Sequence, residues 1–148
     1  MKSIKKVELR ARMIRVAELK VPYNITINGP QQVAKAAMSI LDGEDQEVFL
    51  TFMLNIKNKI LGYTEVARGA VDFCPVDQRA VFRAAVIVGA SGIVAAHCHP
   101  SGDPEPSIDD RTMTERLVKV GEVLGIKVLD HVIVGCNGFV SMAEKGWL

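Results

Sequence analysis

Residues 92–110 read GIVAAHCHPSGDPEPSIDD, and this stretch decides the fold expected for the chain. The part from Gly92 to His97 is short, apolar and bounded by glycine, which predicts a buried strand. The segment from Pro100 to Pro106 holds three prolines and a glycine, so it cannot be regular structure. Ser107 then begins a helix that is expected to run to about Leu124, because glycine follows there. A strand, a rigid loop and a helix are therefore expected in direct succession.

Hydrophobic patterns on both sides of this stretch predict the remaining elements. Strands are expected at 7–13, 47–55, 60–68, 126–134 and 139–142, and helices at 31–41 and 76–88, the second with Pro75 at its first position. This order predicts an α/β fold with a mixed β-sheet flanked by helices. We expect one domain over residues 1–148, with a short strand and helix extension over about 1–44.

Composition sets limits on the class of protein. The chain has 148 residues, 49% of them hydrophobic and 24% charged, and a net charge of +1, which is typical of one globular domain. No apolar run reaches the roughly 18 residues that a membrane helix needs, so no membrane partner is expected. Three cysteines without a CxxC pair, and no continuous apolar segment after the basic start, predict a cytoplasmic protein.

Two of the three histidines stand at His97 and His99, where the predicted strand ends. Alternate residues of an extended chain point the same way, so both imidazoles are expected on one side. Ser107 and Asp110 lie three apart in the first turn of the next helix and are therefore neighbours. Two imidazoles and one carboxylate make a three-ligand zinc set with a fourth position for water. Ser-x-x-Asp is also a helix-capping signature, and the two roles can coexist.

At this spacing the motif HxHP-x6-SxxD resembles the JAMM motif of JAB/MPN-domain metalloproteases. The surrounding sequence is similar to the RadC-like branch of that family in three segments, AAHCHPSGDPEPSIDD at 95–110, GIKVLDHVIVG at 125–135 and GFVSMAEKGWL at 138–148. The resemblance implies the MPN/JAB fold, whose layered architecture is like that of cytidine deaminases. The sequence departs from the branch at Cys98, where asparagine is usual, and the segment upstream is too short for the branch's helical N-terminal region.

The resemblance also implies roles for five residues. His97, His99 and Asp110 would bind Zn²⁺, Glu47 at the start of EVFLTFMLN would act as general base, and Ser107 would orient the site or stabilise the tetrahedral intermediate. The implied function is a zinc-dependent metallopeptidase-type hydrolase that cleaves an amide or isopeptide bond of a protein or peptide with metal-activated water.

Other readings stay open. The same fold serves as a non-catalytic MPN-like interaction module, and the RadC label suggests DNA repair by association. The balanced charge argues against a dedicated nucleic-acid binder, although the basic run between Lys2 and Arg15 leaves that partner open, and self-association is open as well. A nucleobase deaminase is excluded because H-x-E followed by P-C-x-x-C is missing. His131 is expected to be a structural histidine and Cys98 a core thiol.

Overall fold

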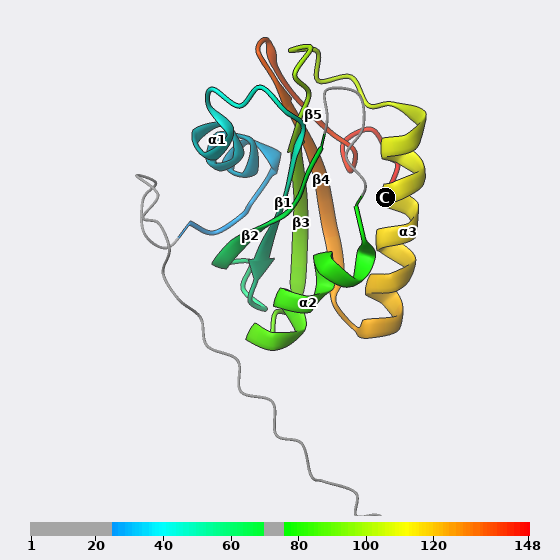
Figure 1. Cartoon of the computed structure of the whole chain (residues 1–148). Helices are drawn as coiled ribbons and strands as arrows, with labels where there is room; N and C mark the ends of the chain where they lie inside the picture. Colours follow the sequence, from blue (N-terminus) through cyan, green and yellow to red (C-terminus); the bar gives the residue numbers. More distant parts are fainter. Residues whose placement is uncertain (1–24, 70–75) are drawn as a thin grey trace, which may run out of the picture.

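The computed structural model describes residues 25–69 and 76–148. Within these ranges the chain forms three helices and five strands (Figure 1). They are α1 (Pro30–Leu41), β1 (Val48–Leu54), β2 (Ile60–Arg68), α2 (Gln78–Val88), β3 (Gly92–Cys98), α3 (Ile108–Leu124), β4 (Lys127–Gly135) and β5 (Gly138–Ser141). The strand expected at 7–13, the basic run near it, Cys74 and Pro75 lie outside the described residues.

All five strands belong to one sheet in the order β2-β1-β3-β4-β5. The β3–β4 pair is parallel and the other pairs are antiparallel, so the sheet is mixed. Helix α1 covers one face, whereas α2 and α3 cover the other, which gives three layers (Figure 1). The predicted α/β fold is confirmed. None of the described helices is long and apolar enough to span a bilayer.

Strand β1 shows why the sheet is covered on both faces. Every residue of VFLTFML is buried, as expected for a strand that packs against helices on each side. Val48, Leu50 and Phe52 join the core under α1. Phe49 and Met53 join the core under α2 and α3. Successive side chains alternate between faces, so a run that is apolar except for Thr51 contributes to both cores.

Helix α2 begins later than the sequence pattern predicts. The helix expected at 76–88 starts at Gln78, and Asp77 caps it by accepting a hydrogen bond from the Arg79 backbone N–H at 2.9 Å. An aspartate side chain satisfies a free N–H of the first turn, which fixes the start of the helix at the residue after it. The prediction was wrong by two residues because it relied on proline alone as the start signal.

The crossover from β3 through α3 to β4 determines where the site lies. Parallel neighbours require such a crossover, and α3 supplies it. The carboxyl end of β3 and the amino end of α3 therefore meet at the same edge of the sheet, which is where open α/β sheets place their ligand sites. The loop 99–107 joins these two ends.

Candidate metal centre

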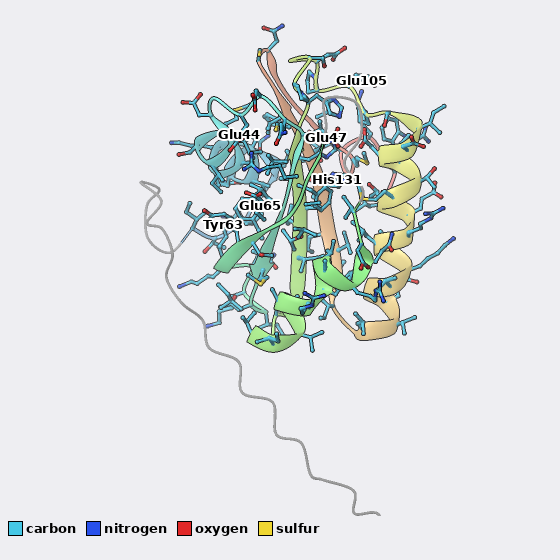
Figure 2. All side chains as sticks on the ribbon, in the orientation of Figure 1. Glu44, Glu47, Tyr63, Glu65, Glu105 and His131 are labelled. Atoms are coloured by element: carbon cyan, nitrogen blue, oxygen red, sulfur yellow. The ribbon has the colours of Figure 1, made fainter. Side chains whose placement is uncertain are left out.

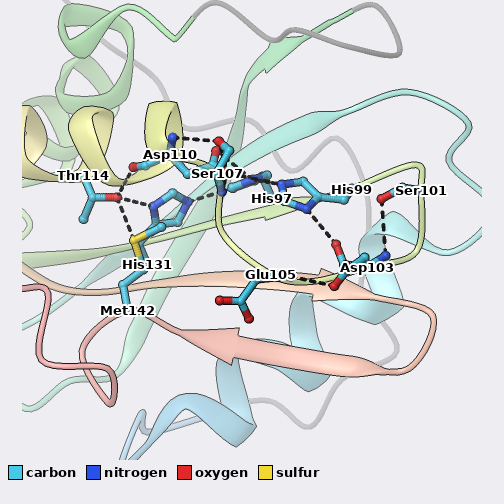
Figure 3. Close-up of polar contacts among 10 residues, drawn as sticks. All are labelled: His97, His99, Ser101, Asp103, Glu105, Ser107, Asp110, Thr114, His131 and Met142. Atoms are coloured by element: carbon cyan, nitrogen blue, oxygen red, sulfur yellow. Dashed lines mark hydrogen bonds and ion pairs between the residues drawn. The ribbon is translucent and has the colours of Figure 1, made fainter.

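Two histidines and an aspartate converge at this edge of the sheet. His97 lies near the end of β3, His99 directly follows β3, and Asp110 lies in the first turn of α3. One ligand atom from each residue lies within 4.8 Å of the others (Figure 3). Among the described residues, this is the group of three whose geometry suits a metal ion. The spacing of the sequence motif is thus matched by proximity in space.

The two imidazole rings lie on the same side of β3. Their centroids are 4.8 Å apart, and the two Nε2 atoms approach to 2.9 Å. The His97 ring is fully buried and stacks on Phe49 with centroids 5.9 Å apart. His99 is partly exposed. The His97 ring therefore lies in the core, and the His99 ring lies on the solvent side of the site.

Asp110 is held by the start of its own helix. Its Oδ2 accepts hydrogen bonds from the Ser107 backbone N–H at 2.8 Å and from the Ser107 hydroxyl at 2.7 Å. The Asp110 backbone N–H in turn donates to Ser107 Oγ at 3.1 Å, which completes a capping box. The capping alternative for the Ser-x-x-Asp pattern is thus present, and the same carboxylate faces both histidines.

The carboxylate lies close to both rings and carries a charge. Asp110 Oδ1 is 3.2 Å from His97 Nε2, and Oδ2 is 3.4 Å from His99 Nε2. Burial alone would raise the pKa of Asp110, but its interactions with the two adjacent histidines outweigh burial and hold that pKa well below its usual range. Hydrogen bonding to Asp110 likewise raises the pKa of His99 against the effect of burial. An ionised carboxylate between two imidazoles is a suitable anionic ligand.

His99 is anchored by the backbone of the loop. Its Nδ1–H donates to the carbonyl oxygen of Asp103 at 2.7 Å. The loop folds back at Gly102, whose φ of 81° lies in the left-handed region. The Gly102 carbonyl accepts from the backbone N–H of Cys136 at 2.9 Å, which ties the loop to the turn between β4 and β5. A side chain on Gly102 would meet the Cys136 sulfur at 2.8 Å.

His97 is anchored by side chains that sequence reasoning did not place at the site. His97 Nδ1 lies 2.8 Å from His131 Nε2, and His131 Nδ1 lies 2.6 Å from Thr114 Oγ1 (Figure 3). Burial, with a smaller effect from His97, lowers the pKa of His131 well below its usual range. The available signals were a polar pair inside the apolar strand LDHVIVG and a threonine four residues after Asp110 on the same face of α3.

Glu47 lies beside this cluster and outside the group of three. It directly precedes β1, and β1 pairs with β3 so that Phe49 faces His97. Continuing that register puts Glu47 opposite His99. Burial raises the pKa of Glu47, the histidines lower it and Asp110 raises it, so all three groups act on this carboxylate. Figure 2 shows Glu47 at the same end of the sheet.

Cys98 points away from the two histidines. Its thiol donates to the Gln46 carbonyl at 3.4 Å and packs against the core under α1. Burial raises the pKa of this thiol. The alternation of side chains along β3 therefore gives Cys98 the position expected of a core thiol.

The donor set suits a divalent metal ion. His99 donates its Nδ1 proton to the Asp103 carbonyl. In the neutral ring, the Nε2 lone pair is then directed at His97 and Asp110. Three electron-rich atoms facing one point favour a cation between them. Two imidazoles with one carboxylate are the ligand types of catalytic zinc sites. The residues present therefore fit such a metal.

These features define a three-layered α/β domain with a candidate single-metal centre at the carboxyl end of its central strand. The family model of the RadC-like JAB domain matches residues 27–147. The chain belongs to the RadC-like JAB domain family, as the sequence resemblance suggested.

Proteins named UPF0758 are among its relatives. The one from Caldanaerobacter subterraneus is 43% identical over 124 residues, which cover 84% of this chain and 53% of that protein. The one from Desulforamulus reducens is 36% identical over 146 residues, covering 97% and 64%. The one from Bacillus cereus is 40% identical over 139 residues, covering 94% and 60%. The chain thus spans between half and two thirds of the length of these relatives.

Proposed function

We propose that this domain is a zinc-dependent metallopeptidase-type hydrolase that cleaves an amide or isopeptide bond in a protein or peptide, in the cytoplasm. The observation that carries the proposal is the convergence of His97, His99 and Asp110, with one ligand atom each within 4.8 Å. Membership of a JAB domain family, which includes metalloproteases, supports the same reading.

His97, His99 and Asp110 would hold the ion through their imidazole Nε2 atoms and carboxylate. A zinc ion bound there supplies a Lewis acid that polarises a carbonyl and lowers the pKa of water to about 7. The fixed orientation of both rings and of the carboxylate keeps the ligands in place before the metal binds. Preorganised ligands of this kind lose little conformational freedom on binding.

Glu47 is the group we assign to proton transfer. Burial raises its pKa, and a raised pKa brings a carboxylate closer to the range in which it can both accept and return a proton near neutral pH. The register of β1 and β3, continued to Glu47 and His99, supports a role beside the ligands rather than as one of them. Glu47 would take a proton from the attacking water and later deliver it to the leaving amine.

Ser107 is the residue that we assign to stabilising the oxyanion. Its hydroxyl proton is engaged with Asp110 Oδ2 at 2.7 Å. Stabilising an oxyanion would require that proton to turn from Asp110 towards the substrate, while the oxygen still accepts from the Asp110 backbone N–H at 3.1 Å. A switching hydrogen bond of this kind would let one residue serve as cap and as electrostatic helper.

Metal binding and hydrolysis test the proposal on the same protein. The wild-type domain is titrated with Zn²⁺ against a chelator, then assayed on fluorogenic peptides and on peptides joined through a lysine isopeptide bond. Glu47→Gln should retain zinc affinity and lose roughly 10²- to 10⁴-fold in turnover. Glu44→Gln is the matched control, because Glu44 lies three residues earlier and pairs with Arg68, away from the ligands. It should retain full turnover.

Two results would contradict the proposal in different ways. A wild-type domain that binds no Zn²⁺ overturns the metal site itself. A domain that binds Zn²⁺ and hydrolyses no amide or isopeptide probe points instead to a non-catalytic interaction module. Loss of zinc in Glu47→Gln would make Glu47 a ligand and overturn its assigned role.

A further inference from the structure

A chain of buried hydrogen bonds runs from the backbone of α3 to the ring of His97. Thr114 Oγ1 lies 2.7 Å from the carbonyl oxygen of Asp110 and 2.6 Å from His131 Nδ1. His131 Nε2 lies 2.8 Å from His97 Nδ1 (Figure 3). Thr114, His131 and His97 are each 0% exposed. Water does not reach these side chains, so each polar atom depends on its neighbour in this chain of hydrogen bonds for a partner.

The direction of donation along this chain of hydrogen bonds follows from the acceptor to which Thr114 donates. A hydroxyl group has one proton to donate. Besides His131, Thr114 Oγ1 is close to two atoms that act here as acceptors, the Asp110 carbonyl oxygen and the Met142 sulfur at 3.1 Å. In its contact with the Asp110 carbonyl the hydroxyl is the donor, and we place its proton there. The Thr114 oxygen is left to accept, which requires the proton of His131 to be on Nδ1.

This direction determines the tautomer of His97. A neutral imidazole with its proton on Nδ1 has a bare Nε2, so His131 accepts from His97. The His97 proton is then on Nδ1, and its Nε2 lone pair faces Asp110 and His99. His99 reaches the same state independently through the Asp103 carbonyl. Both rings thus present the unprotonated Nε2 that a metal ion needs.

We propose that Thr114 and His131 are positioning residues that fix His97 in the metal-binding tautomer and orientation. This inference rests on the metal site of the proposed function and adds a supporting layer that extends to α3 and β4. Outer partners of this kind orient metal ligands and commonly contribute about 10- to 100-fold in affinity. If each hydrogen bond from Thr114 to His97 were donated in the opposite direction, His97 Nε2 would have to lose a proton before it could bind a metal.

Two buried threonines allow a matched test. Thr51 is also 0% exposed, but its hydroxyl has no hydrogen-bond partner among the described residues. Thr114→Val and Thr51→Val therefore make the same chemical change, and only the first breaks the chain. We expect Thr114→Val to weaken Zn²⁺ binding by about 10- to 100-fold. Thr114→Ser, which keeps the hydroxyl, and Thr51→Val should both bind Zn²⁺ as the wild type does.

A spectroscopic readout separates positioning from a general loss of structure. In the metal-free wild type at mildly alkaline pH, long-range ¹H–¹⁵N spectra of the histidine rings should show protonated Nδ1 and bare Nε2 for both His97 and His131. Thr114→Val should move the His131 proton to Nε2 and disturb the His97 pattern. Circular dichroism and thermal unfolding of each variant establish that it is folded.

The outcomes are distinguishable from failure of the metal site itself. Wild-type Zn²⁺ affinity in a folded Thr114→Val, or a metal-free His97 with its proton on Nε2, overturns this inference and leaves the proposed function standing. A wild type that binds no Zn²⁺ overturns the proposed function. If Thr114→Val does not fold, the wild-type tautomers and the Thr114→Ser affinity decide the question.

Discussion

The two histidines of the candidate metal centre are held in different ways. The inner half of the site consists of His97, His131 and Thr114, which lie wholly inside the core. The outer half consists of His99 and the loop 100–106, where the partner of the ring is the Asp103 carbonyl. The inner half depends on which side chains are present, whereas the outer half depends on the path of the backbone.

This difference predicts different sensitivities to substitution. A side-chain change in the inner half removes a hydrogen-bonding group from a place that water cannot fill. A side-chain change in the outer half leaves the anchoring carbonyl intact unless the loop itself moves. Asp110 joins the two halves, because its carboxylate lies next to both rings.

The largest expected effects come from the two histidine ligands. His97→Ala and His99→Ala should each abolish tight Zn²⁺ binding. The metal-free variants should differ in stability, because His97→Ala leaves a cavity and an unpaired His131, at a cost of about 3 kcal/mol. His99→Ala removes a partly exposed ring and should cost about 1 kcal/mol or less. Chemical denaturation in the presence of a chelator measures both, and equal losses would contradict the distinction between the halves.

The next effect concerns the residue that holds Asp110. Ser107→Ala should lower the free energy of unfolding by about 1 kcal/mol through the lost cap. It should also reduce turnover on the order of 10²-fold if the hydroxyl stabilises the oxyanion. Ser107→Thr keeps a hydroxyl and should retain most of both properties. Unfolding and kinetics on the same variants separate the two roles, and a stability loss with unchanged turnover would leave Ser107 as a cap only.

A smaller effect is expected from the path of the outer loop. Gly102→Ala introduces a Cβ 2.8 Å from the Cys136 sulfur and should displace the loop, which lowers Zn²⁺ affinity by about tenfold. Gly89→Ala is the control: Gly89 also has a positive φ, of 68°, but a Cβ there meets no described atom within 4 Å. Gly89→Ala should leave Zn²⁺ affinity unchanged. Equal affinities in the two variants would show that the loop does not position His99.

The smallest effect is expected where a side chain in the outer half is removed and its backbone is kept. Asp103→Ala leaves the carbonyl that accepts from His99, and its own carboxylate bonds only the Glu105 backbone N–H at 3.0 Å among the described contacts. Zn²⁺ affinity should stay at the wild-type level, and stability should change by about 0.5 kcal/mol or less. A large loss of affinity in the same titration would mean that the Asp103 carboxylate itself acts at the site.

The parts of the site that sequence reasoning predicted are the parts that are local in the chain. His97 and His99 are two residues apart on a strand, and Asp110 follows in the first turn of the next helix, so their proximity depends on one short connection. The fold was predicted for a similar reason, since β1, β3 and α3 each have a clear hydrophobic pattern. The roles assigned to Glu47 and Ser107 stay predictions.

The supporting residues of the inner half could not be predicted in the same way. His131 and Thr114 are 34 and 17 residues from their partners His97 and His131. They meet because β3 and β4 pair in parallel, with Ala95 beside His131, and because α3 packs over that pair. Nothing in the local pattern fixes that register. The expectation that His131 is structural did not foresee its contact with His97.

The place of β3 in the sheet has a consequence for the speed of metal exchange. β3 is the middle strand of five, with β1 and β4 hydrogen-bonded on either side. Central strands open only when the whole domain unfolds, whereas surface loops open at far lower cost. If the proposed metal site binds an ion, His97 would stay in place, and the ion would enter and leave on the side of His99 and the loop 100–106. The residence time of the ion would then depend on the loop, even though both histidines would contribute to affinity.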